Sequence, residues 1–450
     1  MVVQKFGGTS VADVDAITRL IAIVRTARAR DGRGPAVVVS AMSGVTDALL
    51  RLAGDAAAGH QHEALARLQE LRRRHEEAAR VLAADDHALP AQLARELDQV
   101  ESVLGALAVL RDVSPRTLDL VAATGELLTS RIVTAALRQA GLPGAWVDPR
   151  HVVITSGEHT RAVPLLPETT AAMRARLVPI LDAGDVPVVG GFVGATPQGQ
   201  TTTLGRGGSD YSGALVGAGV GADEIQIWTD MDGMLTADPR VIDGPRLVPL
   251  LSFAEAAELA YFGAKVLHPS TMLPAVERDI PVRILNSRRP DGSGTRITAA
   301  GATDGSAVTA LACKREVTVI DVTSSRMLMA YGFLRQVFEV FERFRTAVDV
   351  VTTSEVSVSV TIDDTREIEG IRRGLEGLGD VRIEAGMALL CAVGDRLRDE
   401  PEAGARVVAI LEEVPLRMIS QAASRRNITV VLRQDDLPRA MQRLHEELFG

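Results

Sequence analysis

The segment from Thr201 to Tyr211 holds the groups that are most informative about chemistry. It reads Thr-Thr-Thr-Leu-Gly-Arg-Gly-Gly-Ser-Asp-Tyr and precedes a helix of small residues that we expect over 212–219. Glycine lets backbone N–H groups turn toward an anion, and the start of a helix adds partial positive charge there. Arg206 can hold a planar carboxylate or phosphate through two parallel hydrogen bonds, whereas Asp210 would meet an ammonium group or orient Arg206. The segment therefore indicates a site for a small zwitterion beside a phosphate donor.

Two more polar loops follow short apolar stretches that we expect to be strands. Lys5-Phe-Gly-Gly-Thr-Ser10 follows the first stretch, and Ser40-Ala-Met-Ser-Gly-Val-Thr46 follows the second. Ligands of open α/β sheets bind at the carboxyl ends of strands, where Lys5 would place a charge and the glycines would expose amides. A strand–helix turn with an exposed lysine is an equal alternative for the first loop. The hydroxyls of the second loop could bind a substrate or only cap the next helix.

Three other stretches contribute charges. Thr124-Gly-Glu126 would open a helical stretch, where a first-turn carboxylate favours any helix and could also hold an amino group. The loop 228–240 contains three carboxylates and Arg240, and could bind a nucleotide or simply connect two elements. Lys265 lies in the apolar stretch 262–269, from which it could reach a phosphate or extend to solvent.

No single one of these loops could catalyse phosphoryl transfer. One helix terminus contributes only ~0.3–2 kcal/mol, whereas a catalyst must supply at least ~8 kcal/mol. Phosphoryl transfer depends on positioning and charge stabilisation, which Lys5, Arg240 and Lys265 could supply together to Mg-ATP. The P-loop pattern is absent from the sequence, and the glycines of 217–221 have the spacing of a helix end rather than of a dinucleotide site. The sequence therefore predicts a site assembled from several strand ends.

Composition disfavours several classes of protein. The chain has 450 residues, a net charge of −9 and 3% aromatic residues, so neither a basic surface nor base stacking points to nucleic acid. The densest basic run, Arg72–His75, lies among glutamates and predicts a solvated helix face. Cys313 and Cys391 are expected to be reduced core residues. The chain begins as a strand without a secretory signal, and no apolar run of about 18 residues predicts a membrane span, so we expect a cytoplasmic location.

The elements that must position these loops follow from periodicity. The first ~300 residues alternate apolar stretches with helical patterns, which predicts a mainly parallel α/β sheet. The expected strands are 2–5, 36–40, 186–192, 224–228 and 282–285, and the expected helices are 13–30, 62–111 with a break near 85–90, 118–139 and 252–262. Gly, Asp, Ser and Thr gather over 289–306, as at a domain boundary.

The rest of the chain predicts the ferredoxin-like order twice. Strands at 318–323, 348–353 and 356–362 alternate with helices at 332–344 and 365–378. A second round follows at 388–393, 402–412, 416–421, 428–433 and 437–448. This second round lacks one strand. We therefore expect a strand near 308–312 to complete it, so that the two units interleave.

The motifs at 5–10, 124–126, 201–211, 228–230 and 262–269 together resemble those of the aspartokinases, in the same order along nearly the whole chain. The resemblance implies the amino-acid kinase fold, a three-layer αβα domain with a mainly parallel open sheet, over 1–298. Two ferredoxin-like (ACT) α+β units would follow over 305–386 and 387–450. It also implies transfer of the ATP γ-phosphate to the β-carboxylate of L-aspartate, the first step toward lysine, methionine, threonine and diaminopimelate.

The resemblance assigns roles residue by residue. Lys5, Asp210 and Lys265 would be catalytic, and magnesium would be held mainly by the nucleotide phosphates, without a metal site in the chain. Aspartate would be surrounded by Ser40, Thr46, Glu126, Arg206, Ser209 and Asp210, with Arg206 on its α-carboxylate and Glu126 near its amino group. ATP would be held by Lys5, Gly7, Gly8, Ser10, Thr229, Asp230, Arg240 and Lys265. Lysine-sensitive members often carry tyrosine where this chain has Leu235, which leaves that nucleotide contact open.

The region 327–357 resembles the effector site of the lysine-inhibited members. L-Lysine would contact Met327, Phe333, Leu334, Val348, Asp349, Thr353, Ser354 and Glu355. Ala330 replaces a serine of a close relative, and feedback by threonine, concerted feedback and an insensitive enzyme stay open. ACT units leave sheet edges that pair across a two-fold axis, so we expect a homodimer or a larger homo-oligomer.

Two alternatives are open from the sequence: a catalytically silent amino-acid sensor, and a related kinase for glutamate, acetylglutamate or carbamate. Lys5, Arg206, Asp210 and Lys265 argue against the sensor. Glu126 and the ACT pair favour a substrate with a free amino group, since a buried carboxylate partner can reject an analogue lacking that group by ~10⁴-fold.

Overall fold

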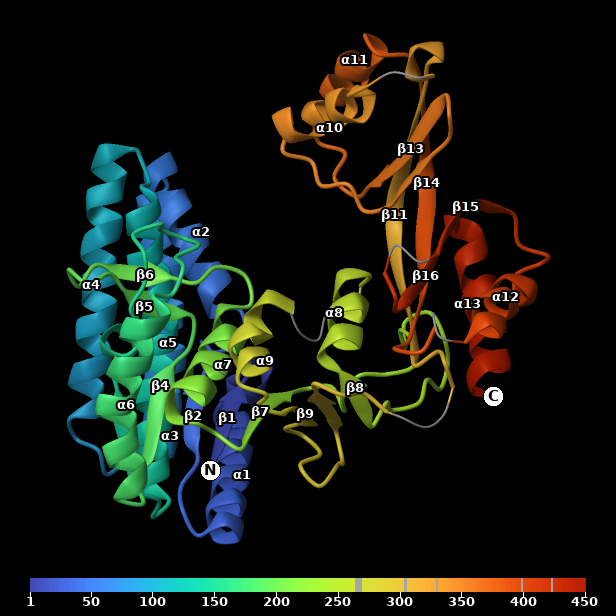
Figure 1. The fold of residues 1–450 in the computed structure, drawn as a ribbon. Coiled ribbons are helices and arrows are strands. Elements are labelled where there is room, and N and C mark those ends of the chain that lie inside the picture. Colours follow the sequence, from blue (N-terminus) through green and yellow to red (C-terminus); the bar gives the residue numbers. More distant parts are fainter. Residues whose placement is uncertain (264–268, 303–305, 329–330, 398–399, 422–423) are drawn as a thin grey trace. The chain divides into compact units, whose positions relative to one another are not determined.

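The computed structural model describes residues 1–450 except 264–268, 303–305, 329–330, 398–399 and 422–423 (Figure 1). Its contacts divide the chain into two compact units. The first is Met1–Met234 with Leu267–Ala299, and the second is Leu235–Val266 with Ala300–Gly450. The domain ranges expected from the sequence stay predictions, because a unit that is compact by its contacts need not be a domain that acts alone.

The first unit is built on a mainly parallel sheet. Its strands lie in the order β3 (Gly144–Val147), β4 (Val186–Gly190), β2 (Ala36–Val39), β1 (Val2–Phe6), β7 (Glu224–Thr229), β9 (Val282–Asn286) and β10 (Thr295–Thr298). β10 runs antiparallel to β9, and the other neighbouring strands are parallel. The expected parallel α/β sheet is confirmed. A short hairpin of β5 (Val193–Ala195) and β6 (Thr201–Thr203) stands beside it.

Helices cover both faces of this sheet. One face packs against α1 (Val14–Asp31) and the bundle of α2 (Val45–Ala58), α3 (Gln61–Leu82), α4 (Leu89–Leu110) and α5 (Pro115–Gln139), whose long helices stand side by side in Figure 1. Phe6 points to that core, so Lys5, its neighbour on the strand, points to the other face. There α7 (Gly208–Val220) packs with α6 (Leu166–Asp182) and α9 (Leu273–Glu277). The unit therefore has three layers, as expected.

Local signals set the ends of these helices. Asp13 caps α1 by accepting a hydrogen bond from the Ala16 amide, and Ser114 caps α5 by accepting one from Thr117, just before Pro115. α7 ends at Gly221, whose amide donates to the Gly217 carbonyl, which confirms that the glycines of 217–221 form a helix end. α5 is long and apolar enough to cross a membrane, but 89% of its most apolar window is buried inside the fold, as in a core helix.

The basic run on α3 is the exposed face that we expected at Arg73 and Arg74 but not at His75. His75 is fully buried and its Nδ1 donates to the Leu71 carbonyl at 2.7 Å, while burial lowers the pKa of His75 to about 4. Arg74 donates to the carbonyls of Ser43 and Ala12 at 3.0 and 2.8 Å. The prediction is wrong for His75, because that side of α3 packs within the helix bundle, whereas Arg73 and Arg74 are exposed as expected.

The second unit carries an antiparallel sheet. Its strands lie in the order β12 (Val351–Thr353), β13 (Ser357–Ile362), β11 (Ala310–Thr323), β14 (Asp380–Val393), β16 (Asn427–Arg433) and β15 (Leu416–Gln421). The two long strands serve both ferredoxin-like halves. The first residues of β11 pair with the last residues of β14, and the later residues of β11 pair with β13. The expected interleaving through a strand near 308–312 is thus confirmed.

Each half of this sheet has its own helices and core. α10 (Phe333–Arg343) and α11 (Ile368–Glu376) pack on one half, and α12 (Pro401–Ile410) and α13 (Leu437–Phe449) on the other. The unit also contains β8 (Leu250–Ser252) and α8 (Phe253–Tyr261), which begins with a capping box between Ser252 and Glu255. Cys391 is buried and Cys313 is partly buried, and both are free thiols, as expected.

Candidate functional site

Four loops emerge at the same edge of the first unit's sheet. The parallel registers pair Phe6 with Val39 and with Trp228, and Val39 with Gly190, so the chain leaves four neighbouring strands at one level. These loops and the start of α7 line a cavity of about 510 Å³. Strand ends that are far apart in the sequence therefore converge on one site.

Lys5 lines this cavity near the end of β1. Its Nζ lies 2.7 Å from Asp210 Oδ1, and the two side chains are only 8% and 18% exposed. Gly213, on the same helix as Asp210, lets α7 approach the lysine, since a Cβ at that position would lie 3.1 Å from the Cβ of Lys5. The alternative of an exposed lysine is therefore wrong, and Asp210 meets an ammonium group that belongs to the chain itself.

Two helices begin at the cavity without a side-chain cap. The N-cap residues of α2 and α7 are Gly44 and Gly207, with φ of 78° and 72°, and neither helix has a side-chain cap hydrogen bond. The first amides of a helix have no partner inside it, and together with the helix dipole they attract anions. The capping alternative for the hydroxyls of Ser40–Thr46 is thus wrong. Both helix starts favour a phosphate or carboxylate in the cavity.

Glu126 brings a buried carboxyl group to the same cavity. It lies in the interior of α5, which begins at Pro115, so the expectation of a first-turn carboxylate is wrong. The residue is 3% exposed, and among the described residues its Oε2 has no hydrogen-bond partner. Burial raises the pKa of the Glu126 carboxyl to about 8, although backbone hydrogen bonds and the nearby Lys5 ammonium oppose this shift. A cationic ligand such as an amino group would satisfy this oxygen and restore the ionised form.

The cavity brings together most of the residues that the sequence singled out for catalysis and binding. They are Lys5, Gly7, Gly8, Ser40, Thr46, Glu126, Ser209, Asp210, Thr229 and Asp230. Ser10 is not among them: it is buried, and its hydroxyl lies 3.1 Å from the Trp228 carbonyl and 2.7 Å from the Ser287 hydroxyl. These bonds tie the short turn after β1 (Gly8–Val11) to the ends of β7 and β9, so Ser10 would support the site without lining it.

The other predicted cations are Arg206, Arg240 and Lys265. Arg206 lies in the loop that lines the cavity, is exposed, and has no ion-pair partner in the part of the chain that the structure describes. Arg240 belongs to the second unit, where its guanidinium pairs with Asp238 at 2.7 Å. Lys265 lies outside the described residues. Leu235, also in the second unit, forms a β-bridge with Leu247.

Sequence reasoning missed Phe192, which also lines the cavity. Its φ of 63° is rare for a bulky side chain. The Phe192 amide donates a hydrogen bond to Ser212 Oγ at 2.9 Å, and this bond holds the backbone in that conformation. Gly190 and Gly191 directly before it, at the end of a buried strand, were the signal that could have marked this loop.

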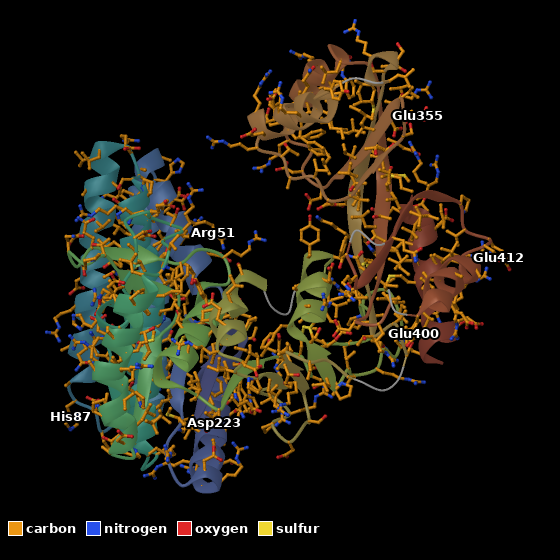
Figure 2. All side chains as sticks on the ribbon, viewed as in Figure 1. Arg51, His87, Asp223, Glu355, Glu400 and Glu412 are labelled. Carbon is orange, nitrogen blue, oxygen red and sulfur yellow. The ribbon has the colours of Figure 1, made fainter. Side chains whose placement is uncertain are left out.

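The residues expected to contact an effector fall into two groups in the second unit. Met327, Phe333 and Val348 belong to the apolar cluster of the first ferredoxin-like half. The exposed ones are Leu334, Thr353, Ser354 and Glu355, and Figure 2 shows Glu355 on the outside of this unit. The Ser324 amide donates to the Val356 carbonyl at 2.8 Å, so the turn before Met327 lies beside the turn that carries Glu355. Ala330 lies outside the described residues.

Asp349 already holds an ammonium group. Lys314 Nζ donates to its two oxygens at 2.9 and 3.0 Å, and the Tyr261 hydroxyl donates to Oδ1 at 3.1 Å. Burial lowers the pKa of Lys314, but its hydrogen bonds to Asp363 and Asp349 outweigh burial and leave that pKa raised. The Asp349 side chain is 3% exposed. A ligand that placed its amino group on Asp349 would therefore have to replace the Lys314 ammonium.

Comparison with known sequences agrees with the two-part organisation. Residues 1–286 match the amino acid kinase family, and residues 390–448 match the ACT domain. The chain is 36% identical over 458 residues to lysine-sensitive aspartokinase 3 of Escherichia coli (strain K12), covering 100% of this chain and 99% of that protein. It is 36% identical over 469 residues to the chloroplastic aspartokinase 3 of Arabidopsis thaliana, covering 99% of this chain and 81% of that protein.

Comparison with solved structures finds the same architecture over the full length. Crystal structures of E. coli aspartokinase III, at 35% identity, cover 100% of both chains. The TM-score is 0.84 for its complex with aspartate and ADP (R-state) and 0.85 for its complex with lysine and aspartate (T-state).

Proposed function

This chain belongs to the amino acid kinase family and, within it, to the aspartokinases, and we propose that it transfers the γ-phosphate of ATP to the β-carboxylate of L-aspartate. The products would be 4-phospho-L-aspartate and ADP. One observation carries this proposal: a single cavity brings together the Lys5 ammonium, two uncapped helix starts and the Glu126 carboxyl, whose Oε2 has no partner among the described residues.

The chemical difficulty of this reaction is electrostatic. An oxygen of the β-carboxylate forms a bond to the γ-phosphorus while the bond from that phosphorus to the bridging oxygen breaks, and ADP leaves with the electron pair. The attacking carboxylate is already anionic, so it needs no general base. Lys5, held in place by Asp210, would lower the repulsion between the two anions, and the helix amides would stabilise the charge on the phosphoryl oxygens.

Aspartate would be held at its two other charged groups. Glu126 would accept hydrogen bonds from the α-ammonium group, because its buried Oε2 needs a partner. Arg206 would hold the α-carboxylate, since its exposed guanidinium is uncommitted within the described residues. The hydroxyls of Ser40, Thr46 and Ser209, which line the same cavity, would orient the β-carboxylate.

The nucleotide would lie on the side of the cavity that carries Thr229 and Asp230, together with Gly7 and Gly8. The Gly7 amide already donates to the Trp228 carbonyl at 2.9 Å, so Gly7 would contribute close backbone approach rather than a donor. Arg240 and Lys265 are proposed as further contacts to ATP. Within the described residues, no group of three or more His, Cys, Asp or Glu side chains is arranged to hold a metal ion. We propose that Mg²⁺ is held mainly by the nucleotide phosphates, whose charge it would reduce.

Regulation and cellular context complete the proposal. L-Lysine is the proposed effector at the region around Met327 and Glu355, since the E. coli relative is described as lysine-sensitive. The enzyme would act in the cytoplasm in amino-acid biosynthesis. β12 and β15 are the edges of the second unit's sheet, and edge strands are available for pairing, so at least a homodimer is proposed.

Trapping of the acyl phosphate with hydroxylamine tests this function directly. The assay would compare L-aspartate with L-glutamate and N-acetyl-L-aspartate, each with and without lysine and threonine. Hydroxamate should form with L-aspartate alone, and lysine should suppress it. Equal yields from glutamate would assign another substrate, and no product from any acid would favour the silent sensor.

A further inference from the structure

A second buried carboxylate lies on the same helix as Glu126. Asp119 is 0% exposed, and among the described residues no lysine or arginine pairs with it. Its oxygens accept hydrogen bonds from His159 Nδ1 at 2.6 Å, from the Thr160 amide at 3.0 and 3.1 Å, and from the Thr203 hydroxyl. We call Asp119, His159, Thr160 and Thr203 the Asp119 cluster. Burying a carboxylate costs free energy unless it is fully hydrogen-bonded, so Asp119 requires these donors in order to remain buried.

Thr160 has a backbone conformation that is unfavourable for its residue type. Its φ is 69°, which is rare for a β-branched residue and stores strain. The bonds from its amide to both oxygens of Asp119 hold this conformation. Strain of this kind persists where the surrounding contacts impose it, often near a functional site.

The cluster is joined to the loop that carries Arg206. Thr203 ends β6, so it directly precedes residues 204–209. The Ala162 amide donates to the Thr203 carbonyl at 2.9 Å, and a Cβ on Gly205 would lie 3.2 Å from the Thr160 carbonyl. Gly205, Gly207, Gly208 and Ser209 of this loop line the cavity. The start of the Arg206 loop is thus held against α5 by one carboxylate.

α5 carries both Asp119 and Glu126. Asp119 and Glu126 are seven residues apart on α5, which places them on nearly the same face, about 10 Å apart along the axis. Glu126 faces the proposed site of the substrate ammonium group. Asp119 fixes the loop that carries Arg206, the proposed ligand of the substrate α-carboxylate. α5 therefore sets the separation between the two groups that would hold the amino-acid substrate.

From this geometry we propose that Asp119 is a positioning residue for amino-acid recognition: through Thr160 and Thr203 it holds the Arg206 loop at a set distance from Glu126. This inference rests on the proposed function for its substrate, and on the structure alone for its effect on the loop. Asp119 does not line the cavity, so it acts only through the loop.

The test uses Asp119→Asn and Thr203→Val in the full-length protein. Asparagine keeps the size of the side chain but cannot accept from all three donors, and valine removes only the Thr203 hydroxyl. If the Arg206 loop is displaced, L-aspartate binds more weakly. KM for L-aspartate should therefore rise roughly tenfold in Asp119→Asn and roughly threefold in Thr203→Val. KM for ATP and kcat should each stay within about twofold. Amide hydrogen exchange should become faster at residues 203–209.

Two further variants separate positioning from stability. Thr160→Gly relieves the strain at φ 69°, so adding it to Asp119→Asn should recover part of the affinity for aspartate. Asp148→Asn is the matched control, since Asp148 is another largely buried carboxylate, paired with Arg150 and without a bond to the loop. It should lower stability without changing KM for aspartate.

Several results would overturn the inference. Unchanged KM for aspartate in Thr203→Val, together with unchanged exchange at 203–209, would do so even if Asp119→Asn did not fold. An equal loss of affinity for ATP and aspartate would mean general destabilisation. If the wild type formed no hydroxamate from aspartate, the proposed function would fail, and hydrogen exchange at 203–209 would still decide whether Asp119 holds the loop.

Discussion

Replacing Glu126 by glutamine should make the free protein more stable and the enzyme much weaker toward aspartate. Burial raises the pKa of this carboxyl from its ordinary 4.5 to about 8. Between these values the folded protein holds a proton that the unfolded chain lacks, so unfolding releases a proton. Stability from this group is therefore fully present below about pH 4.5 and is lost as the pH rises through about 8. Glutamine cannot titrate, so the variant should not show this loss.

The size of the effect follows from proton linkage. One proton changes the unfolding free energy by about 1.4 kcal/mol per pH unit. From about pH 5 to about pH 7.5, the wild type should therefore lose about 3 kcal/mol relative to Glu126→Gln. The same substitution removes the charged partner of the substrate ammonium. A hydrogen bond to a charged group contributes about 1.5–3 kcal/mol, so KM for L-aspartate should rise roughly 10- to 150-fold.

Urea denaturation at the two pH values, with and without aspartate, measures both effects. Aspartate should stabilise the wild type but hardly the variant. Glu63→Gln, a change of an exposed carboxylate on α3, is the control and should leave the pH dependence unaltered. Parallel stability curves for wild type and Glu126→Gln over this range would show that Glu126 does not carry the raised pKa. An unchanged KM would remove it from the ammonium site.

Four other predictions concern the cation, the effector region and assembly. Lys5→Ala should lower kcat by roughly 10²–10³-fold, as for loss of one preorganised donor, and near-normal turnover in a steady-state assay would exclude the proposed role. Glu355→Ala should weaken inhibition by lysine while sparing kcat, and a loss of activity without lysine would contradict the separation of the two sites. Lys314→Met leaves the buried Asp349 carboxylate without its ammonium partner, so the unfolding free energy should fall by roughly 1–3 kcal/mol. Adding Asp349→Asn should recover part of that loss, and no recovery would refute the pairing argument. Sedimentation should show at least a dimer, and a monomer at every concentration would contradict this.

Much of the fold was predictable because its signals are local. Strand 36–40 and helix 13–30 follow from apolar periodicity, and the structure places them within one residue. The structure adds the cap at Asp13, which is a local signal too. The interleaved second unit was also predictable, since the second ferredoxin-like round lacked a strand and β11 supplies it.

The failures have two physical causes: contacts with distant segments, and a backbone conformation that the residue type does not indicate. His75 and Glu126 were interpreted from their own helix, but burial by neighbouring helices decides their environment. Phe192 was overlooked because the type of a non-glycine residue does not indicate a positive φ, and the two glycines before it mark only the loop. Asp119 looked like an ordinary helix residue, since its partners His159, Thr160 and Thr203 come from later segments.

The sequence by itself determined which groups are available and which loops carry them, because residue type, periodicity and capping act over a few neighbouring positions. Only the tertiary structure decided which of these groups meet. The Lys5–Asp210 ion pair, the raised pKa of Glu126 and the hold of Asp119 on the Arg206 loop all depend on segments far apart in the chain. Charge interactions and burial depend on distance in space, which the order of residues does not state.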